Sequence, residues 1–231
     1  MRTIVEHLTA LPHRGKPVHS ATVRAAALLL VLLVTGAIST AHAGFIALDS
    51  TRVTGNQSYT GLLGMDFDVL APIRVTHLGA FDSGQDGVGV INVGIFNRAS
   101  QTLVAGLNAI IDGSDPLTGQ SRFEDIADVV LGIGSYSIVA IGYNASNPNG
   151  NSGSVGPAPT INSGGLISFV NGGRYQLAVA LAFPTIGDGG PANRYDAGTF
   201  QFEAASAIPA PATLALLGLG LTIIGFSSRA K

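Results

Sequence analysis

The chain lacks cysteine entirely, and the stretch from residue 44 to residue 206 contains no lysine. The absence of cysteine excludes thiol nucleophiles, thiolate metal sites and a disulfide scaffold together. Six arginines stand against thirteen acidic residues in this stretch, so its net charge is −7, whereas the whole chain carries −2. Because nucleic-acid binding requires clustered positive charge, the composition argues against a nucleic-acid partner.

Groups that carry out catalysis are also scarce. His77 is the single histidine after residue 43, and it falls in the middle of an expected strand. A Ser-His-Asp triad would have to use it, yet no G-x-S-x-G nucleophile elbow occurs in the chain. One histidine without any cysteine also argues against a zinc site. We therefore expect a structural or surface role for this histidine and a protein that is not an enzyme.

Two carboxylates keep one hydrolytic hypothesis open. Asp66 and Asp68 are two residues apart on an expected strand, which puts their side chains on one face about 7 Å apart. Glycosidases use carboxylate pairs at such distances. Outward residues of a half-buried strand are polar in any case, so we expect this pair to be solvated. A glycan hydrolase that uses the pair is kept as a third hypothesis, after the two functions given at the end of this section.

The segment DSGQDG, residues 82–87, resembles half of a calcium-binding loop. Asp82, Asp86 and Gly87 occupy positions 1, 5 and 6 of an EF-hand loop, but Val93 stands at position 12, where an acidic residue is needed. The EF-hand motif therefore fails, and Asp and Gly are also the residues of any tight turn. Asp82 and Asp86 remain the candidate calcium ligands, and the sequence predicts no other cofactor.

Short apolar runs separated by glycine-rich turns predict an all-β domain. The clearest expected strand is residues 174–183, with Tyr175, Leu177, Val179, Leu181 and Phe183 on one face. In residues 64–70, Met65, Phe67 and Val69 should point inward and the two aspartates outward. One short helical turn is expected within residues 124–132. Further strands are expected at residues 45–49, 73–81, 89–96, 102–111, 135–143, 166–170 and 198–203.

Several of these runs are apolar on both faces, which suits central strands of two stacked layers. The sequence therefore predicts an antiparallel β-sandwich, jelly-roll-like, over residues 44–206. A closed barrel with the same number of strands is the alternative, and the pattern does not separate the two. Residues 144–165 form a long polar loop, and residues 184–196 form a shorter one, both expected at an end of the sandwich where binding loops often lie.

The first 43 residues have the features of a secretory signal peptide with a long charged n-region. An uncharged run at residues 25–38 is followed by Ala41-His42-Ala43, a small-x-small pattern typical of signal peptidase sites. The run is about 14 residues long, short of the roughly 20 that cross a bilayer. We expect cleavage between Ala43 and Gly44 and export of the chain.

The last residues, 207–231, contain Pro209, Ala210 and Pro211 near their start and continue as an uncharged apolar run to residue 226. As a helix this run of 16 residues would be about 24 Å long, slightly shorter than the hydrocarbon core. Arg229 and Lys231 follow it and would lie on the cytoplasmic side. A C-terminal transmembrane helix over residues 211–226 is therefore expected.

The sequence IPAPATLALLGLGLTIIGFSSRAK, residues 208–231, resembles the PEP-CTERM sorting signal of Gram-negative bacteria. That signal has a Pro-Glu-Pro motif, a Leu/Gly-rich transmembrane helix and a short basic end. This chain departs from it at Ala210, where the family usually has Glu. The resemblance implies processing by an exosortase, passage through an inner-membrane intermediate, and release to the cell surface or the extracellular matrix of a biofilm-forming bacterium that makes exopolysaccharide.

Two functions from different classes follow. The first is a non-enzymatic, exported surface or matrix protein, processed by signal peptidase and an exosortase and associated with exopolysaccharide. The second is a carbohydrate-binding, lectin-like module in which the loops at residues 82–86, 144–165 and 184–196 contact polysaccharide, with or without calcium. The sequence names neither the ligand nor the oligomeric state.

Overall fold

Two antiparallel sheets contain the long strands of the protein. A computed structural model of the chain describes residues 44–153 and 156–205. The five-stranded sheet has the order β1-β15-β4-β8-β7, and the six-stranded sheet has the order β13-β12-β3-β9-β5-β6. Two further pairs, β10 with β14 and β11 with β2, have two residues in each strand. The elements are β1 (Phe45–Ile46), β2 (Leu48–Asp49), β3 (Leu62–Val69), β4 (Ile73–Phe81), a 3₁₀ turn η2 (Ser83–Gln85), β5 (Ile91–Asn97), β6 (Leu103–Ile111), β7 (Leu117–Thr118), β8 (Ser121–Leu131), β9 (Gly134–Ile141), β10 (Gly150–Asn151), β11 (Thr160–Ile161), β12 (Ile167–Gln176), β13 (Ile186–Gly189), β14 (Tyr195–Asp196) and β15 (Gly198–Ala204).

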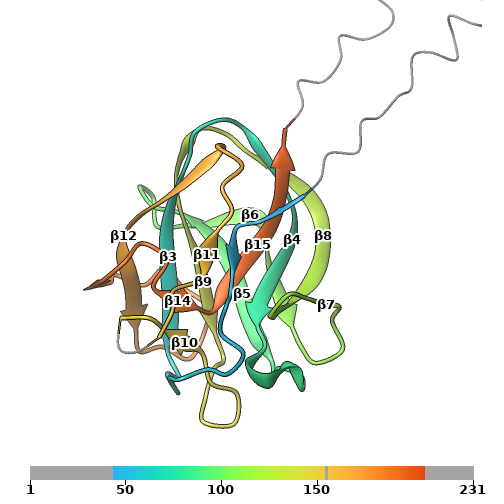
Figure 1. Ribbon diagram of the computed structural model, residues 1–231. Coiled ribbons are helices and arrows are strands. Elements are labelled where there is room, and N and C mark those ends of the chain that lie inside the picture. Colours follow the sequence, from blue (N-terminus) through green and yellow to red (C-terminus); the bar gives the residue numbers. More distant parts are fainter. Residues whose placement is uncertain (1–43, 154–155, 206–231) are drawn as a thin grey trace, which may run out of the picture. The chain divides into compact units, whose positions relative to one another are not determined.

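The expected all-β fold of antiparallel sheets is confirmed, and alternation of apolar residues accounts for it. In β3, Met65, Phe67 and Val69 are buried on the face that looks toward the other sheet, as predicted. The rings of Phe67 in β3 and Phe200 in β15 lie 5.0 Å apart, so the two sheets meet over one apolar core. Figure 1 shows β12 and β3 on one side of the domain and β15, β4 and β8 on the other.

The predicted strand at residues 174–183 is wrong over most of its length. β12 includes residues 174–176, but pairing with β3 ends where Gln176 faces Leu62, the first residue of β3. Without a partner the chain leaves the sheet, and the side chains of Leu177 and Val179 are 75% and 104% exposed. Alternation alone therefore predicted a strand for which the fold supplies no neighbour.

Beyond this point the chain folds back over the outer face of the six-stranded sheet. Phe183 is buried there against Phe96, with their ring centroids 6.2 Å apart. A second, smaller apolar cluster results on the face opposite the main core, and its buried members are Leu62, Phe96, Val139, Ile141 and Phe183. The outer face of this sheet is therefore partly covered by chain rather than by solvent.

The helical turn expected within residues 124–132 is also wrong, because residues 124–131 belong to β8. This strand of 11 residues pairs antiparallel with β4 from Phe81↔Ser121 to Ile73↔Leu131, with one register shift. Pairing along nearly the whole of β4 outweighs any local helical preference.

The predicted terminal features lie outside the described residues. These are the signal helix with Ala43, the sorting motif Pro209, Ala210 and Pro211, the apolar run to residue 226, and the basic end Arg229 and Lys231. Gly44, on the other side of the expected cleavage point, is the first described residue. Within residues 44–153 and 156–205, no helix is long and apolar enough to span a bilayer.

Candidate functional site

The expectation that Asp66 is solvated is wrong. Its side chain is fully buried, and both carboxylate oxygens accept hydrogen bonds from Arg174 Nε at 2.8 Å. Asn171 Nδ2 donates to Oδ2 at 3.1 Å, and Arg98 Nε lies 3.5 Å from the same oxygen. Asp68, two residues on, is partly exposed and lies 3.2 Å from Arg98 Nη1. The two aspartates do share a face, as predicted, but that face holds an arginine cluster.

The other predicted aspartates, Asp82 and Asp86, lie on either side of the turn η2. Asp82 is fully buried, and its Oδ2 accepts hydrogen bonds from Arg122 Nε at 2.7 Å and from the Gly87 amide at 3.2 Å. Its Oδ1 has no hydrogen-bond partner in the described part of the chain, whereas Asp86 is exposed. No three acidic or histidine side chains gather into a metal-sized group among residues 44–153 and 156–205. Calcium at this pair stays a prediction.

His77 lies in β4 at the surface of the five-stranded sheet. Its Nε2 is 3.8 Å from the exposed carboxylate of Asp125, and its Nδ1 is 2.9 Å from the hydroxyl of Thr76. The polar partners of this imidazole in the described chain are thus a threonine and an exposed aspartate, which are the surroundings of a surface residue.

The polar segment at residues 144–165, described except for residues 154 and 155, packs onto the domain through asparagine side chains. Asn149 is fully buried, where its Oδ1 accepts from the Tyr59 amide at 3.3 Å and its Nδ2 donates to Gln57 Oε1 at 2.9 Å. Asn151 is buried as well, and its backbone amide donates to Asn56 Oδ1 at 2.7 Å. Hydrogen bonds to buried asparagines thus replace the apolar contacts that the segment lacks.

A cavity of about 240 Å³ lies where this segment meets residues 184–196, which were expected as a loop but include the short strands β13 and β14. We call it the tyrosine groove, because three tyrosines from distant parts of the chain line it. Tyr175 comes from β12 and Tyr195 from β14, while Tyr59 precedes β3. The rings of Tyr59 and Tyr175 meet edge to face with centroids 6.1 Å apart. The remaining lining residues are Gln57, Leu63, Asn151, Asp188 and Arg194.

The two charged side chains of the groove, Asp188 and Arg194, form an ion pair. Asp188 lies 3.2 Å from Arg194 Nη2 and accepts a hydrogen bond from the Tyr195 hydroxyl. Arg194 also donates from Nε to Asn151 Oδ1 at 3.1 Å, and its guanidinium lies over the Tyr195 ring, 5.5 Å from the centroid. Burial, and then the hydrogen bond to Asp188, raise the pKa of Tyr195, so its hydroxyl stays protonated and acts as the donor.

Among the described residues that line the groove, Tyr59 has a buried hydroxyl without a hydrogen-bond partner. It is buried, and no described residue donates to it or accepts from it. Burial raises the pKa of Tyr59, and the neighbouring Tyr175 and Asp188 raise it further. A buried hydroxyl without a partner is costly, so a ligand hydroxyl or water that bonded to it would remove a penalty of about 1–3 kcal/mol.

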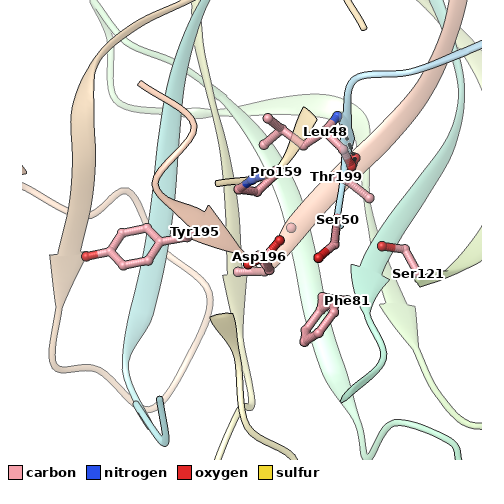
Figure 2. A pocket seen from close by; sticks show the side chains of 10 residues that line it. Leu48, Ser50, Phe81, Ser121, Pro159, Tyr195, Asp196 and Thr199 are labelled. Atoms are coloured by element: carbon pink, nitrogen blue, oxygen red, sulfur yellow. Dashed lines mark hydrogen bonds between the residues drawn. The ribbon is translucent and has the colours of Figure 1, made fainter. Parts of the chain in front are cut away.

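A second, much smaller cavity shares Tyr195 with the groove in its lining. Its volume is about 10 Å³, close to the smallest that holds one water molecule, so it is no ligand site. In Figure 2, Asp196 lies among Ser50, Phe81 and Thr199, whereas the ring of its neighbour Tyr195 points away from Asp196. Burial raises the pKa of Asp196, and Ser50 and Arg52 partly offset this rise.

Sequence reasoning found part of the groove. The two loops expected to carry binding residues do supply Asn151, Asp188, Arg194 and Tyr195. Tyr175 is expected only as a residue of a strand face, and nothing in the sequence points to Tyr59, because no local pattern joins residues more than a hundred positions apart. Comparison of the chain with protein-family models finds no match, and comparison with curated proteins finds none either.

Proposed function

We propose that this protein is a non-enzymatic, carbohydrate-binding protein of the cell surface or extracellular matrix, and that polysaccharide binds in the tyrosine groove. The observation that carries this proposal is the joint presence of aromatic rings, a carboxylate, an amide and a guanidinium around one cavity. Sugar rings present apolar C–H faces to aromatic side chains, and their hydroxyls both donate and accept hydrogen bonds. Tyrosine supplies both kinds of contact at low entropic cost, and Asp188 and Asn151 add acceptors.

We also propose that the domain is a jelly-roll-like β-sandwich. A jelly-roll-like β-sandwich is supported by the two antiparallel sheets over one core, and it places the loops of residues 144–165 and 184–196 together at the groove. The absence of catalysis is supported by the arginines that bind Asp66 and Asp68, the one carboxylate pair suggested for hydrolysis.

The route to the surface is proposed from the sequence alone. Signal peptidase would cut before Gly44, the apolar run of residues 211–226 would hold an inner-membrane intermediate, and an exosortase would act near Pro209 and Pro211. Mass spectrometry of the protein from its native host tests this route. A species that begins at Gly44 and lacks the residues after Pro211 is expected, while an intact C-terminus would contradict sorting by an exosortase.

Binding is tested on a glycan array that includes the host's own exopolysaccharide, with purified full-length protein. Asp188→Asn removes a charge that holds Arg194 and should weaken binding at least tenfold. Asp125→Asn, the same change at an exposed aspartate on the opposite sheet, is the matched control and should leave binding unchanged. No binding to any polysaccharide, or equal binding by wild type and Asp188→Asn, would contradict the proposal.

Calcium assistance is tested in the same experiment with a chelator. Loss of binding in chelator, recovery with calcium, and loss of that recovery in Asp86→Asn would support a site at Asp82 and Asp86. Binding that is unchanged by the chelator would rule calcium out as a requirement and leave the groove proposal intact.

A further inference from the structure

We propose that a second site, on the outer face of the six-stranded sheet, binds a carboxylate group through Arg98 and Arg174. Both side chains line a cavity of about 320 Å³, together with Ala99, Gln101, Ser135 and Phe183. We call this cavity the guanidinium pocket. Arg174 and Tyr175 are neighbours in β12 and point to opposite faces of the sheet, so the pocket and the tyrosine groove are separate sites.

The guanidinium of Arg174 is fixed on two sides. Its Nε donates to both oxygens of the fully buried Asp66, and its plane lies over the Phe183 ring at 5.2 Å from the centroid. Neither terminal nitrogen of Arg174 has a hydrogen-bond partner among the described residues, although the side chain is only 24% exposed. The buried carboxylate therefore orients the arginine and leaves its two outer nitrogens for another acceptor.

Arg98 approaches the same carboxylate from the turn between β5 and β6. Its Nε lies 3.5 Å from Asp66 Oδ2 and its Nη1 lies 3.2 Å from Asp68 Oδ1, which leaves Nη2 without a partner in the described part of the chain. Two planar guanidinium groups with free donors on one cavity form the geometry that binds a carboxylate through paired hydrogen bonds.

The rim of the pocket is uncharged and polar. Gln101 is exposed in a left-handed backbone conformation, with φ of 56°, and its amide makes no hydrogen bond within the described chain. Ser135 is exposed too, and its hydroxyl donates to Asp68 Oδ1 at 2.7 Å, so its oxygen remains an acceptor. An acid group at the arginines and sugar hydroxyls at this rim would match a uronic acid.

Net charge alone does not explain why this pocket would prefer a carboxylate. Asp66 and Asp68 already balance the two arginines, and the described domain as a whole is acidic. A bound anion is therefore recognised through the geometry of the free donors, and we expect millimolar affinity for a single acid group. The site does not depend on the tyrosine groove, so either proposal can fail without the other.

Isothermal titration calorimetry at low ionic strength tests the pocket, with sodium glucuronate, sodium acetate, sodium sulfate and uncharged glucose as probes. Glucuronate should bind, and glucose should not. Equal binding of acetate would identify the carboxylate alone as the determinant, and tighter binding of glucuronate would identify the sugar acid. Tighter binding of sulfate than of both carboxylates, or binding of glucose with the affinity of glucuronate, would overturn the proposal.

Two variants locate the binding. Gln101→Glu places a negative charge at the mouth without touching the Asp66 network and should weaken glucuronate binding at least tenfold. Arg98→Gln removes one of the two guanidinium groups and should have a similar effect. Ala145→Glu adds the same charge in an exposed turn beyond the other end of β9 and should change the affinity less than twofold. No carboxylate binding by wild type, or equal weakening in Ala145→Glu, would overturn the proposal.

Discussion

The segment at residues 144–165 and the segment at residues 177–185 reverse what their compositions suggest. The first is rich in Asn, Gly, Ser and Pro, yet Asn149 and Asn151 are almost completely buried. The second is mostly apolar, yet Leu177 and Val179 lie in solvent. In both segments, a side chain is buried only where the fold supplies it with a hydrogen-bond partner or an apolar neighbour. A polar side chain is buried where every donor and acceptor is met, and an apolar one stays exposed where no neighbour lies alongside.

The largest effect is expected from Phe183→Ala in the apolar segment. Phe183 anchors that segment to the outer sheet face, where it contacts Phe96 and Arg174. Loss of the ring should lower the free energy of unfolding by about 3–4 kcal/mol, measured by urea denaturation. A change below 1 kcal/mol would show that the segment is not held by this residue.

Gly150→Ala should come next, because the polar segment has no room for a side chain at this point. A Cβ atom on Gly150 would lie 2.7 Å from the Cβ of Asp196, which is buried and paired with Arg52. Overpacking of this kind should cost about 3 kcal/mol in the same denaturation experiment. Gly132→Ala is the control, since no atom of the described residues, apart from its two chain neighbours, lies within 4 Å of the position of its added Cβ.

Asn149→Ala removes the hydrogen bonds that bury the polar segment. The Tyr59 amide and Gln57 Oε1 would lose their partner, at a cost of about 2 kcal/mol. Ser146→Ala, at an exposed position in the same segment, should change stability by less than about 0.5 kcal/mol. Equal midpoints for the two variants would mean that the buried asparagine contributes nothing specific.

Alkaline titration probes Tyr143, the residue before the polar segment. Burial raises the pKa of its hydroxyl, which donates to the carbonyls of Phe81 and Ala197. The folded state therefore favours the neutral phenol. Its contribution is complete below the unfolded pKa of about 10 and is lost as the pH rises above that value toward the raised folded pKa.

The variant that tests this is Tyr143→Phe. At neutral pH it should cost about 1 kcal/mol, because two buried carbonyls lose a donor. Above pH 10 its stability should fall less steeply than that of wild type, as followed by thermal unfolding. Parallel pH profiles for the two proteins would mean that another tyrosine dominates the alkaline loss.

The smallest effect is expected from Val179→Ser. Its side chain is fully exposed, so the change should alter the free energy of unfolding by less than about 0.5 kcal/mol. Comparison with Phe183→Ala shows how much the two positions of this one segment differ in their contribution to the free energy of unfolding. A loss comparable to that of Phe183→Ala would show that the outer segment is packed along its whole length.

Strands with strong alternation and a full-length partner were predictable from sequence. Residues 73–81 and 198–203 were expected as strands, and β4 and β15 occupy them and pair with each other. Pairs such as Asp66 with Arg174, 108 residues apart, were not predictable, because no local rule connects them. The tyrosine groove was likewise not predictable as a whole. Its two loops were expected to bind, but their convergence on Tyr59 and Tyr175 follows from the tertiary arrangement.

The two-residue strand β14 contributes one residue to the tyrosine groove and the next to the small inner cavity. Tyr195 faces the groove and is paired with Asn151, while Asp196 faces the inner cavity and is paired with Gly150. Because Gly150 leaves no space beside Asp196, the ladder of β10 and β14 cannot slide without disturbing both ends. If a ligand in the tyrosine groove shifted Tyr195, amide exchange at the buried Asp196 should therefore change as well. We expect exchange at this one amide to indicate whether the groove is occupied.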